Sequence, residues 1–201
     1  MDFRRGFRSE GHEIARQIRR DLELEPHDPV SPWALAESLD IPVTRLSELG
    51  IAEAQYFLSV DSSAFSAVTV FERRKRMIVY NDAHDPGRQA NDVAHEIGHG
   101  LLQHVPRPGL SFFGCRNWDP MEEAEATWLG AAILISEEAA LFIVQSGMTL
   151  MEAAKRYGVS RQLVQMRLNL TAARKRVARM SKGSVRNAIA GARSDSKPRS
   201  A

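Results

Sequence analysis

Two histidines and a glutamate form a five-residue pattern at His95, Glu96 and His99. Histidines four positions apart lie on one face of an α-helix, so both imidazoles can reach a single ion. Zinc binds neutral imidazole nitrogens, and a catalytic zinc site has three protein ligands and an open position for water. Glu96 directly follows the first histidine, where its carboxylate could take a proton from that water and later protonate a departing amine. The pattern therefore predicts two metal ligands, His95 and His99, and a catalytic base, Glu96.

The surroundings of this motif are apolar and contain glycine. Apolar residues flank it at Val93, Ala94, Ile97, Leu101 and Leu102. Gly98 and Gly100 each weaken a helix by about 1 kcal/mol, so we expect another backbone or a substrate to approach closely there. The alternative interpretation is an amphipathic helix whose two histidines have only a structural role.

A third ligand has to come from another element. Three carboxylates stand at the start of a downstream helix: Glu122, Glu123 and Glu125. A metzincin would place a histidine at the position of Val105, so an all-histidine site of that type is excluded. We favour Glu123, because Thr127 lies on the same helix face and can hydrogen-bond a ligand. Glu125 is the main alternative.

The elements that must position these residues are mostly helical. Helices are predicted at about residues 12–22, 31–39, 85–102 and 121–135, the second with Ser31 as its N-cap. β-branched and aromatic residues predict strands at 41–46, 54–60, 66–71 and 77–81. We expect these strands to form a small antiparallel sheet with a hairpin over 66–81, which makes the fold class α+β.

A helix-turn-helix-like unit is predicted near the C-terminus. Thr149 and Glu152 form a capping box, Gly158 ends the first helix, and Ser160 caps the second. Polar side chains on the second helix suit phosphates and base edges: Arg161, Gln162, Gln165 and Arg167. Such a pair of helices is also a common packing element, so DNA binding and docking on the rest of the chain both stay open.

Charge and composition separate the C-terminus from the body. Residues 171–201 hold nine basic residues and one acidic residue, a net charge of +8, whereas residues 1–170 hold 18 basic and 24 acidic residues, a net charge of −6. We divide the chain into a metallopeptidase domain with N-terminal helices at 1–145, the helix-turn-helix-like unit at 146–180, and a basic flexible tail at 181–201. The tail could contact nucleic acid, although most tails of this kind are simply solvated.

The composition favours the cytoplasm. A single cysteine, Cys115, cannot form an intramolecular disulfide, which fits a reducing compartment. The N-terminus lacks the apolar run of a secretory signal. The longest apolar stretches, 128–135 and 139–144, are far shorter than a membrane-spanning helix, so we expect no membrane partner.

Two runs of the sequence carry a family resemblance. They are IVYNDAHDPGRQANDVAHEIGHGLLQH at 78–104 and EEAEATWLGAAILI at 122–135. Together they resemble the ImmA/IrrE family of metallo-endopeptidases, in which a helix reading roughly Glu-x-x-Ala-Asn-x-Phe-Ala follows the HExxH helix. That motif stands here at 123–130, with departures at Thr127, Leu129 and Gly130. The resemblance covers roughly residues 30–170 and implies Glu123 as the third ligand.

The resemblance also implies a function. It predicts a gluzincin-like zinc peptidase with one Zn²⁺ per chain, which cleaves a DNA-binding helix-turn-helix repressor and so relieves repression under stress or in mobile-element control. The alternative is a non-catalytic antirepressor or DNA-binding regulator that keeps the metallopeptidase fold.

Overall fold

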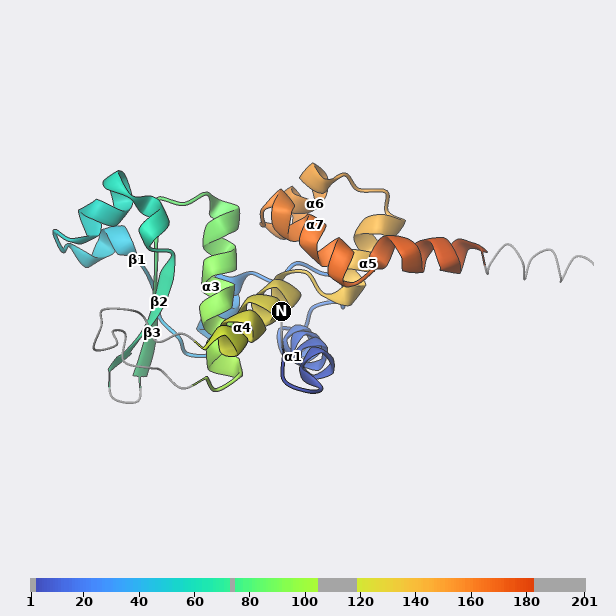
Figure 1. Cartoon of the computed structure of the whole chain (residues 1–201), viewed down its shortest axis with the longest axis horizontal. Coiled ribbons are helices and arrows are strands. Elements are labelled where there is room, and N and C mark those ends of the chain that lie inside the picture. Colours follow the sequence, from blue (N-terminus) through green and yellow to red (C-terminus); the bar gives the residue numbers. More distant parts are fainter. Residues whose placement is uncertain (1–2, 73–74, 105–118, 183–201) are drawn as a thin grey trace, which may run out of the picture.

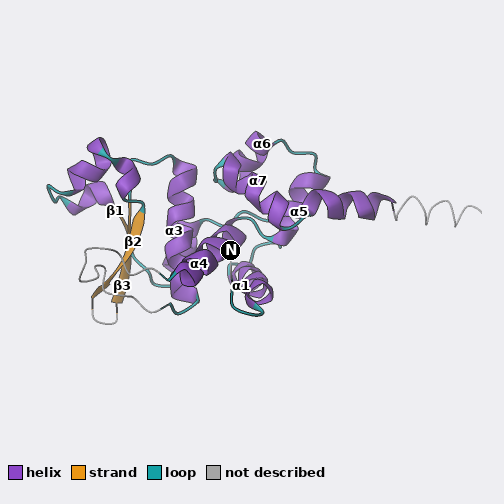
Figure 2. Cartoon of the chain, in the orientation of Figure 1, coloured by secondary structure: helices purple, strands orange, loops and turns teal. Residues whose placement is uncertain are grey.

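The computed structural model describes residues 3–72, 75–104 and 119–182, and helices predominate in it (Figure 2). Its first half contains α1 (Phe7–Asp21), α2 (Pro32–Ser38), β1 (Val43–Arg45), three short helices η1 (Leu46–Leu49), η2 (Tyr56–Val60) and η3 (Ser62–Ala64), β2 (Ala67–Glu72) and β3 (Lys75–Tyr80). Its second half contains α3 (Pro86–Leu101), α4 (Pro120–Leu134), α5 (Glu137–Gln145), α6 (Leu150–Tyr157) and α7 (Arg161–Leu170). Residues 173–182 are also helical and extend away from the body (Figure 1). The predicted mostly helical α+β class is confirmed.

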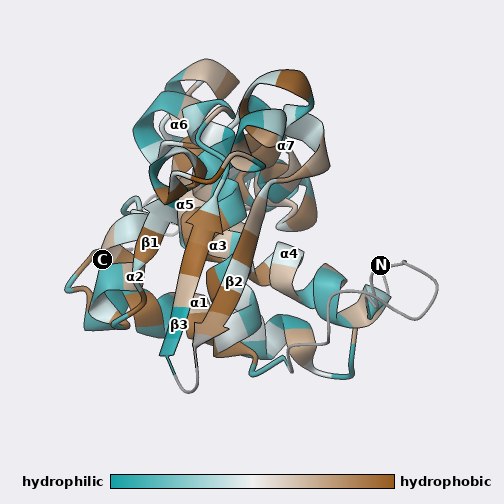
Figure 3. Cartoon of the chain, turned by 90° about the vertical axis from the view of Figure 1, so that its left-hand side faces the viewer, coloured by the Kyte–Doolittle hydropathy of each residue, from teal (hydrophilic) through white to brown (hydrophobic). Residues whose placement is uncertain are grey.

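The sheet has the strand order β1-β3-β2 and is mixed. β2 and β3 pair antiparallel, which confirms the predicted hairpin, but β1 pairs parallel with β3. The prediction of a wholly antiparallel sheet was therefore wrong. Arg45 and Ala67 both pair with Tyr80, so the connection 46–66 stays at one end of the sheet and returns the chain on the far side of β3. Figure 3 shows β3 changing from hydrophilic near the hairpin to hydrophobic toward its end.

The prediction of a strand at 54–60 was also wrong, because these residues are helical. Ala54, Phe57 and Leu58 have the i, i+3, i+4 spacing of one helix face, and all three pack with Val79 of β3 in one apolar cluster. β-branched and aromatic composition gave the wrong prediction here because packing against the sheet outweighs local strand propensity.

Helices α3 and α4 cross in direct backbone contact. A Cβ added at Gly98 would lie 3.0 Å from the carbonyl oxygen of Ala126, and one at Gly130 would lie 3.0 Å from the carbonyl carbon and oxygen of Ala94. The close approach predicted at Gly98 is therefore confirmed. Gly100 instead faces the guanidinium of Arg76.

Two buried arginines bind the end of α4. Arg19 donates from Nη2 to the carbonyl of Ile133 at 2.9 Å, and Arg167 donates from Nε to the carbonyl of Ile135 at 2.8 Å. Burial lowers the pKa of both guanidinium groups to about 10, so both are charged at neutral pH. Positive charge at a helix C-terminus is favourable, and these two residues tie α1 and α7 to α4.

The α6–α7 pair packs against the body. The capping box of Thr149 and Glu152 and the left-handed Gly158 are as predicted. A Cβ at Gly87, in the first turn of α3, would lie 2.7 Å from the backbone of Val159 and Ser160, so the turn between α6 and α7 lies directly on α3.

One of the four side chains predicted to suit DNA is unavailable. Arg167 is fully buried, at 0% exposure, because it caps α4 and lies over the ring of Trp128. Arg161 and Gln162 are exposed and Gln165 is half-buried. Of the basic tail predicted at 181–201, the structure describes residues 181 and 182, and residues 183–201 lie outside the described part of the chain.

Among the described residues no single helix has the length and apolar composition to cross a membrane. Helices α4 and α5 taken together have the length and apolar composition of a membrane span, but the chain bends by 48° at the break between them.

Replacing Gly130 with valine should drive α3 and α4 apart, because no room exists for a side chain against the backbone of Ala94. We expect the free energy of unfolding to fall by about 2–3 kcal/mol, as for other overpacked cores, measured by chemical denaturation. Gly100→Ala is the matched control. Its Cβ meets the movable tip of the Arg76 side chain, and alanine favours a helix more than glycine does, so its stability should not fall below that of the wild type. Equal stabilities of the two variants would contradict the tight crossing.

Candidate metal centre

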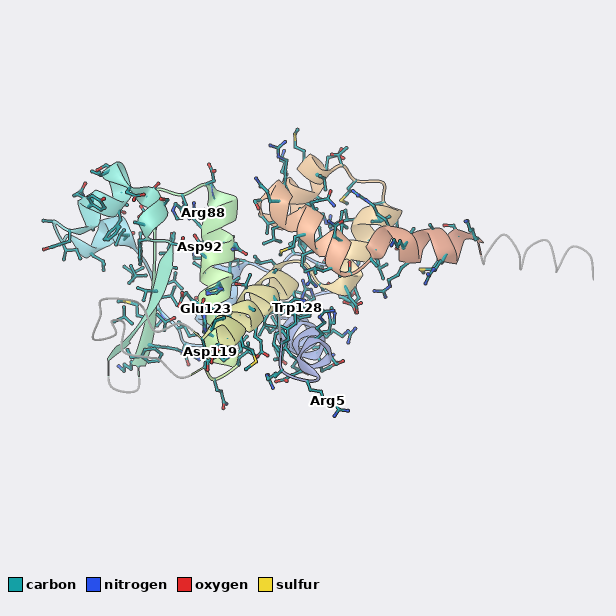
Figure 4. All side chains as sticks on the ribbon, in the orientation of Figure 1. Arg5, Arg88, Asp92, Asp119, Glu123 and Trp128 are labelled. Atoms are coloured by element: carbon teal, nitrogen blue, oxygen red, sulfur yellow. The ribbon has the colours of Figure 1, made fainter. Side chains whose placement is uncertain are left out.

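Three predicted ligands meet where α3 and α4 cross, and Figure 4 marks Glu123 there. The Nε2 atoms of His95 and His99 are 3.0 Å apart. The two carboxylate oxygens of Glu123 lie 3.4 Å from these nitrogens, Oε2 from His95 and Oε1 from His99. Ligands of a tetrahedral ion at 2.0–2.1 Å are separated by about 3.3 Å, so the three donor groups fit a metal ion such as zinc.

The negative charge of Glu123 favours binding of a cation, whereas protons compete with a metal ion for His99. Burial raises the pKa of the Glu123 carboxyl, but hydrogen bonds and charges from His95 and His99 outweigh it and lower this pKa to about 2. Burial lowers the pKa of His99, yet Glu123 and nearby carboxylates raise it overall. Glu123 is therefore anionic at neutral pH. Its charge faces two imidazole nitrogens that a metal ion could bridge.

Glu96, on the same helix, contacts the sheet. Its Oε2 accepts a hydrogen bond from the hydroxyl of Thr69 on β2 at 2.6 Å. The sequence analysis did not predict a role for Thr69, although its position gave a signal. Thr69 is a threonine between two valines, Val68 and Val70, in a predicted strand. Strand alternation puts Thr69 on the opposite face from these two exposed valines, toward α3.

The ring nitrogen of His95 that faces away from the centre has a partner on α4. Thr127 Oγ1 lies 3.3 Å from His95 Nδ1. We predicted that Thr127 would hydrogen-bond a ligand, and the structure places its hydroxyl against one. This contact suits a histidine that binds metal through Nε2, because the Nδ1 proton then needs an acceptor.

Glu125, the alternative third ligand, lies apart from the group. It is 2% exposed, and its carboxylate accepts hydrogen bonds from the backbone N–H and the Nε of Arg4, at 2.9 and 3.0 Å. The structure thus brings Glu123, and not Glu125, together with the two histidines. Cys115, a further conceivable ligand, lies outside the described residues.

Comparison with known families identifies one family for this chain. Residues 36–169 match the family model described as the IrrE N-terminal-like domain, Peptidase_M78. The matched range is about two thirds of the chain and contains His95, Glu96, His99 and Glu123. The chain belongs to this peptidase family.

Membership in the IrrE N-terminal-like family confirms the resemblance drawn from the two motifs and indicates a metallopeptidase-type function. The family match begins at residue 36 and therefore leaves out α1 and the residues before it. A comparison with curated proteins finds no match.

Replacing Glu123 with alanine should remove a ligand, whereas replacing Glu125 should not. We expect Glu123→Ala to lower zinc affinity by at least about 1,000-fold and Glu125→Ala by no more than about 100-fold, the range seen when groups outside the ligand set are lost. The measurement is competition with a chromophoric chelator, with zinc content of the purified proteins as a check. The reverse ranking would assign the third position to Glu125.

Proposed function

We propose that this protein is a zinc-dependent endopeptidase of the gluzincin type, with His95, His99 and Glu123 as zinc ligands and Glu96 as the catalytic base. The observation that carries the proposal is the convergence of three donor groups from two helices, at separations that fit one tetrahedral ion. Glu96 extends from the same helix that supplies two of them.

The residues divide the reaction between them. When bound, zinc would polarise the scissile carbonyl and lower the pKa of a water molecule at its open position to about 7. Glu96 would take the proton of the attacking water and pass it to the amine nitrogen as the C–N bond breaks. Thr69 would hold the Glu96 carboxylate in place through its hydroxyl. Thr127 would accept a hydrogen bond from the Nδ1–H of His95 and fix the orientation of that ring.

An extended peptide has a place to bind beside these groups. Within the described residues β2 pairs only with β3, so β2 forms one edge of the sheet. Thr69 connects this strand directly to Glu96. A substrate segment that pairs with the outer edge of β2 would run past the catalytic carboxylate, and its backbone would be held by main-chain hydrogen bonds.

The proposed substrate is a DNA-binding repressor with a helix-turn-helix, whose cleavage in the cytoplasm would relieve repression under stress or in mobile-element control. Support for this comes from the ImmA/IrrE resemblance and from membership in the IrrE N-terminal-like family. The acidic body of the chain, with a net charge of −6 over residues 1–170, suits a basic DNA-binding partner.

A second candidate function is binding without cleavage, as an antirepressor or DNA-binding regulator. The observation in its favour is that Arg161 and Gln162 are exposed at the start of α7, and that the helical stretch 173–182, which follows α7, is basic. Phosphate contacts from such side chains would weaken steeply as salt rises, because counterions are released on binding.

The variant Glu96→Gln separates the two functions. The amide keeps the size of the side chain but cannot take a proton, so we expect zinc binding to persist and cleavage to fall by at least about 1,000-fold. The assay incubates the protein with a candidate helix-turn-helix repressor, with and without a chelator. Glu13→Gln, on the exposed face of α1, is the control and should cleave normally. Relief of repression by Glu96→Gln, with the repressor intact, would favour the antirepressor.

Thr69→Val tests the hydrogen bond that orients the base. Valine keeps the shape and strand propensity of threonine but removes the hydroxyl that Glu96 accepts from. We expect kcat to fall by about 10-fold, which corresponds to about 1.4 kcal/mol, with zinc content unchanged. Thr44→Val is the matched control, because Thr44 lies on β1 and its hydroxyl contacts Met77. An unchanged kcat in Thr69→Val would show that Glu96 does not need this contact.

A further inference from the structure

The end of α3 folds back on itself and brings a third histidine to the candidate metal centre. The N–H of Gln103 bonds to the carbonyl of Gly100 at 3.2 Å, and the N–H of His104 bonds to the carbonyl of His99 at 3.0 Å. This is the Schellman arrangement, in which the residue after the helix end is left-handed and usually glycine. Here that residue is Gln103, with φ 55°, a conformation that costs a side-chain-bearing residue about 1 kcal/mol or more. The strained turn places His104 beside His99.

The two rings meet through nitrogens that face away from the ligand group. His99 Nδ1 lies 2.9 Å from His104 Nδ1. A contact at this distance requires one nitrogen to carry a proton and the other to accept a hydrogen bond from it. If His99 binds a metal ion through Nε2, its proton must be on Nδ1, so His104 Nδ1 must be the acceptor. The proton of neutral His104 is then on its own Nε2.

That second nitrogen of His104 faces a buried carboxylate. His104 Nε2 is 3.8 Å from Glu125 Oε2, which is an electrostatic contact and not a direct hydrogen bond. Glu125 is 2% exposed and is bound by Arg4 through both its backbone N–H and its guanidinium. Residues from three parts of the chain therefore form one sequence of contacts, Arg4–Glu125–His104–His99.

We propose that His104 is a positioning residue for the metal centre: its Nδ1 accepts a hydrogen bond from the Nδ1–H of His99, so that Nε2 of His99 faces the ion, and Glu125 with Arg4 holds His104 in this orientation. The proposal rests on the proposed function in one respect, that the centre binds zinc. It gives the segment before α1 a role at the metal centre, although that segment precedes the family match, which starts at residue 36. His99 and His95 are then held alike, by His104 and Thr127 respectively.

The test compares two substitutions of His104 in the full-length protein. Asparagine can offer its Oδ1 as an acceptor where His104 has Nδ1, whereas phenylalanine fills the space and accepts nothing. We expect His104→Phe to weaken zinc binding by 10- to 100-fold, measured by competition with a chromophoric chelator, and His104→Asn to stay within about threefold of the wild type. His84→Phe is the control for loss of a buried histidine, because His84 contacts Asp92 and Ser62 and not the metal centre. Its zinc affinity should be unchanged.

Wild-type zinc affinity in His104→Phe would overturn the proposal, and so would equal losses in His104→Phe and His104→Asn. If His104→Phe does not fold, the comparison of Arg4→Ala with Arg5→Ala decides. Arg4 binds Glu125, whereas Arg5 is exposed and points away from the body (Figure 4). We expect zinc affinity to fall several-fold in Arg4→Ala alone, and equal affinities would overturn the proposal. Because the readout is metal binding, absence of peptidase activity in a zinc-loaded wild type would contradict the proposed function and leave this result intact.

Discussion

The backbone contact between α3 and α4 is the constraint on which the candidate site depends. Gly98 lies against the backbone of Ala126, and Gly130 lies against the backbone of Ala94, so the two backbones touch at these positions. Only this separation lets Glu123, at the start of α4, reach the nitrogens of His95 and His99 at 3.4 Å. A tetrahedral ion tolerates little variation in the separation of its ligands, so the crossing of the helices sets the geometry of the metal centre.

Helix α4 is held at both ends as well as at its crossing. Near its start, Glu125 is bound by Arg4. At its end, two carbonyls are bound by the buried guanidinium groups of Arg19 and Arg167. A buried charge is costly unless polar groups bind it. The carbonyl groups at the end of α4 offset part of this cost, although Nη1 and Nη2 of Arg167 have no hydrogen-bond partner within the described residues. The N-terminal helix and the α6–α7 pair therefore support the helix that carries Glu123.

The two sides of α3 serve different purposes. Val93 and Ile97 pack into the core shared with α1, α2 and the sheet, whereas Ala94 packs into the core shared with α5, α6 and α7. The polar side chains of the motif emerge between these two cores. Glu96 turns to β2 and the two histidines turn to α4, so the base and the ligands of the proposed peptidase are held by different elements.

The sequence by itself determined the local features. Spacing of four residues put His95 and His99 on one helix face, the capping residues at Thr149 and Ser160 located α6 and α7, and the hairpin followed from two β-rich runs. These are short-range consequences of backbone geometry, so single-sequence patterns carry them. The same patterns narrowed the third ligand to Glu123 or Glu125 without deciding between them by spacing alone.

Only the tertiary structure decided the rest. Composition predicted a strand at 54–60, yet packing against β3 makes it helical, and β1 joins β3 in parallel through a connection that no local pattern reveals. The sequence predicted that Arg167 could bind phosphates, but its side chain is buried and donates a hydrogen bond to the carbonyl of Ile135 at the end of α4. Contacts such as Thr69 with Glu96, and Arg4 with Glu125, join residues 27 and 121 positions apart. Their partners are chosen by the packing of whole elements, which a window of sequence does not contain.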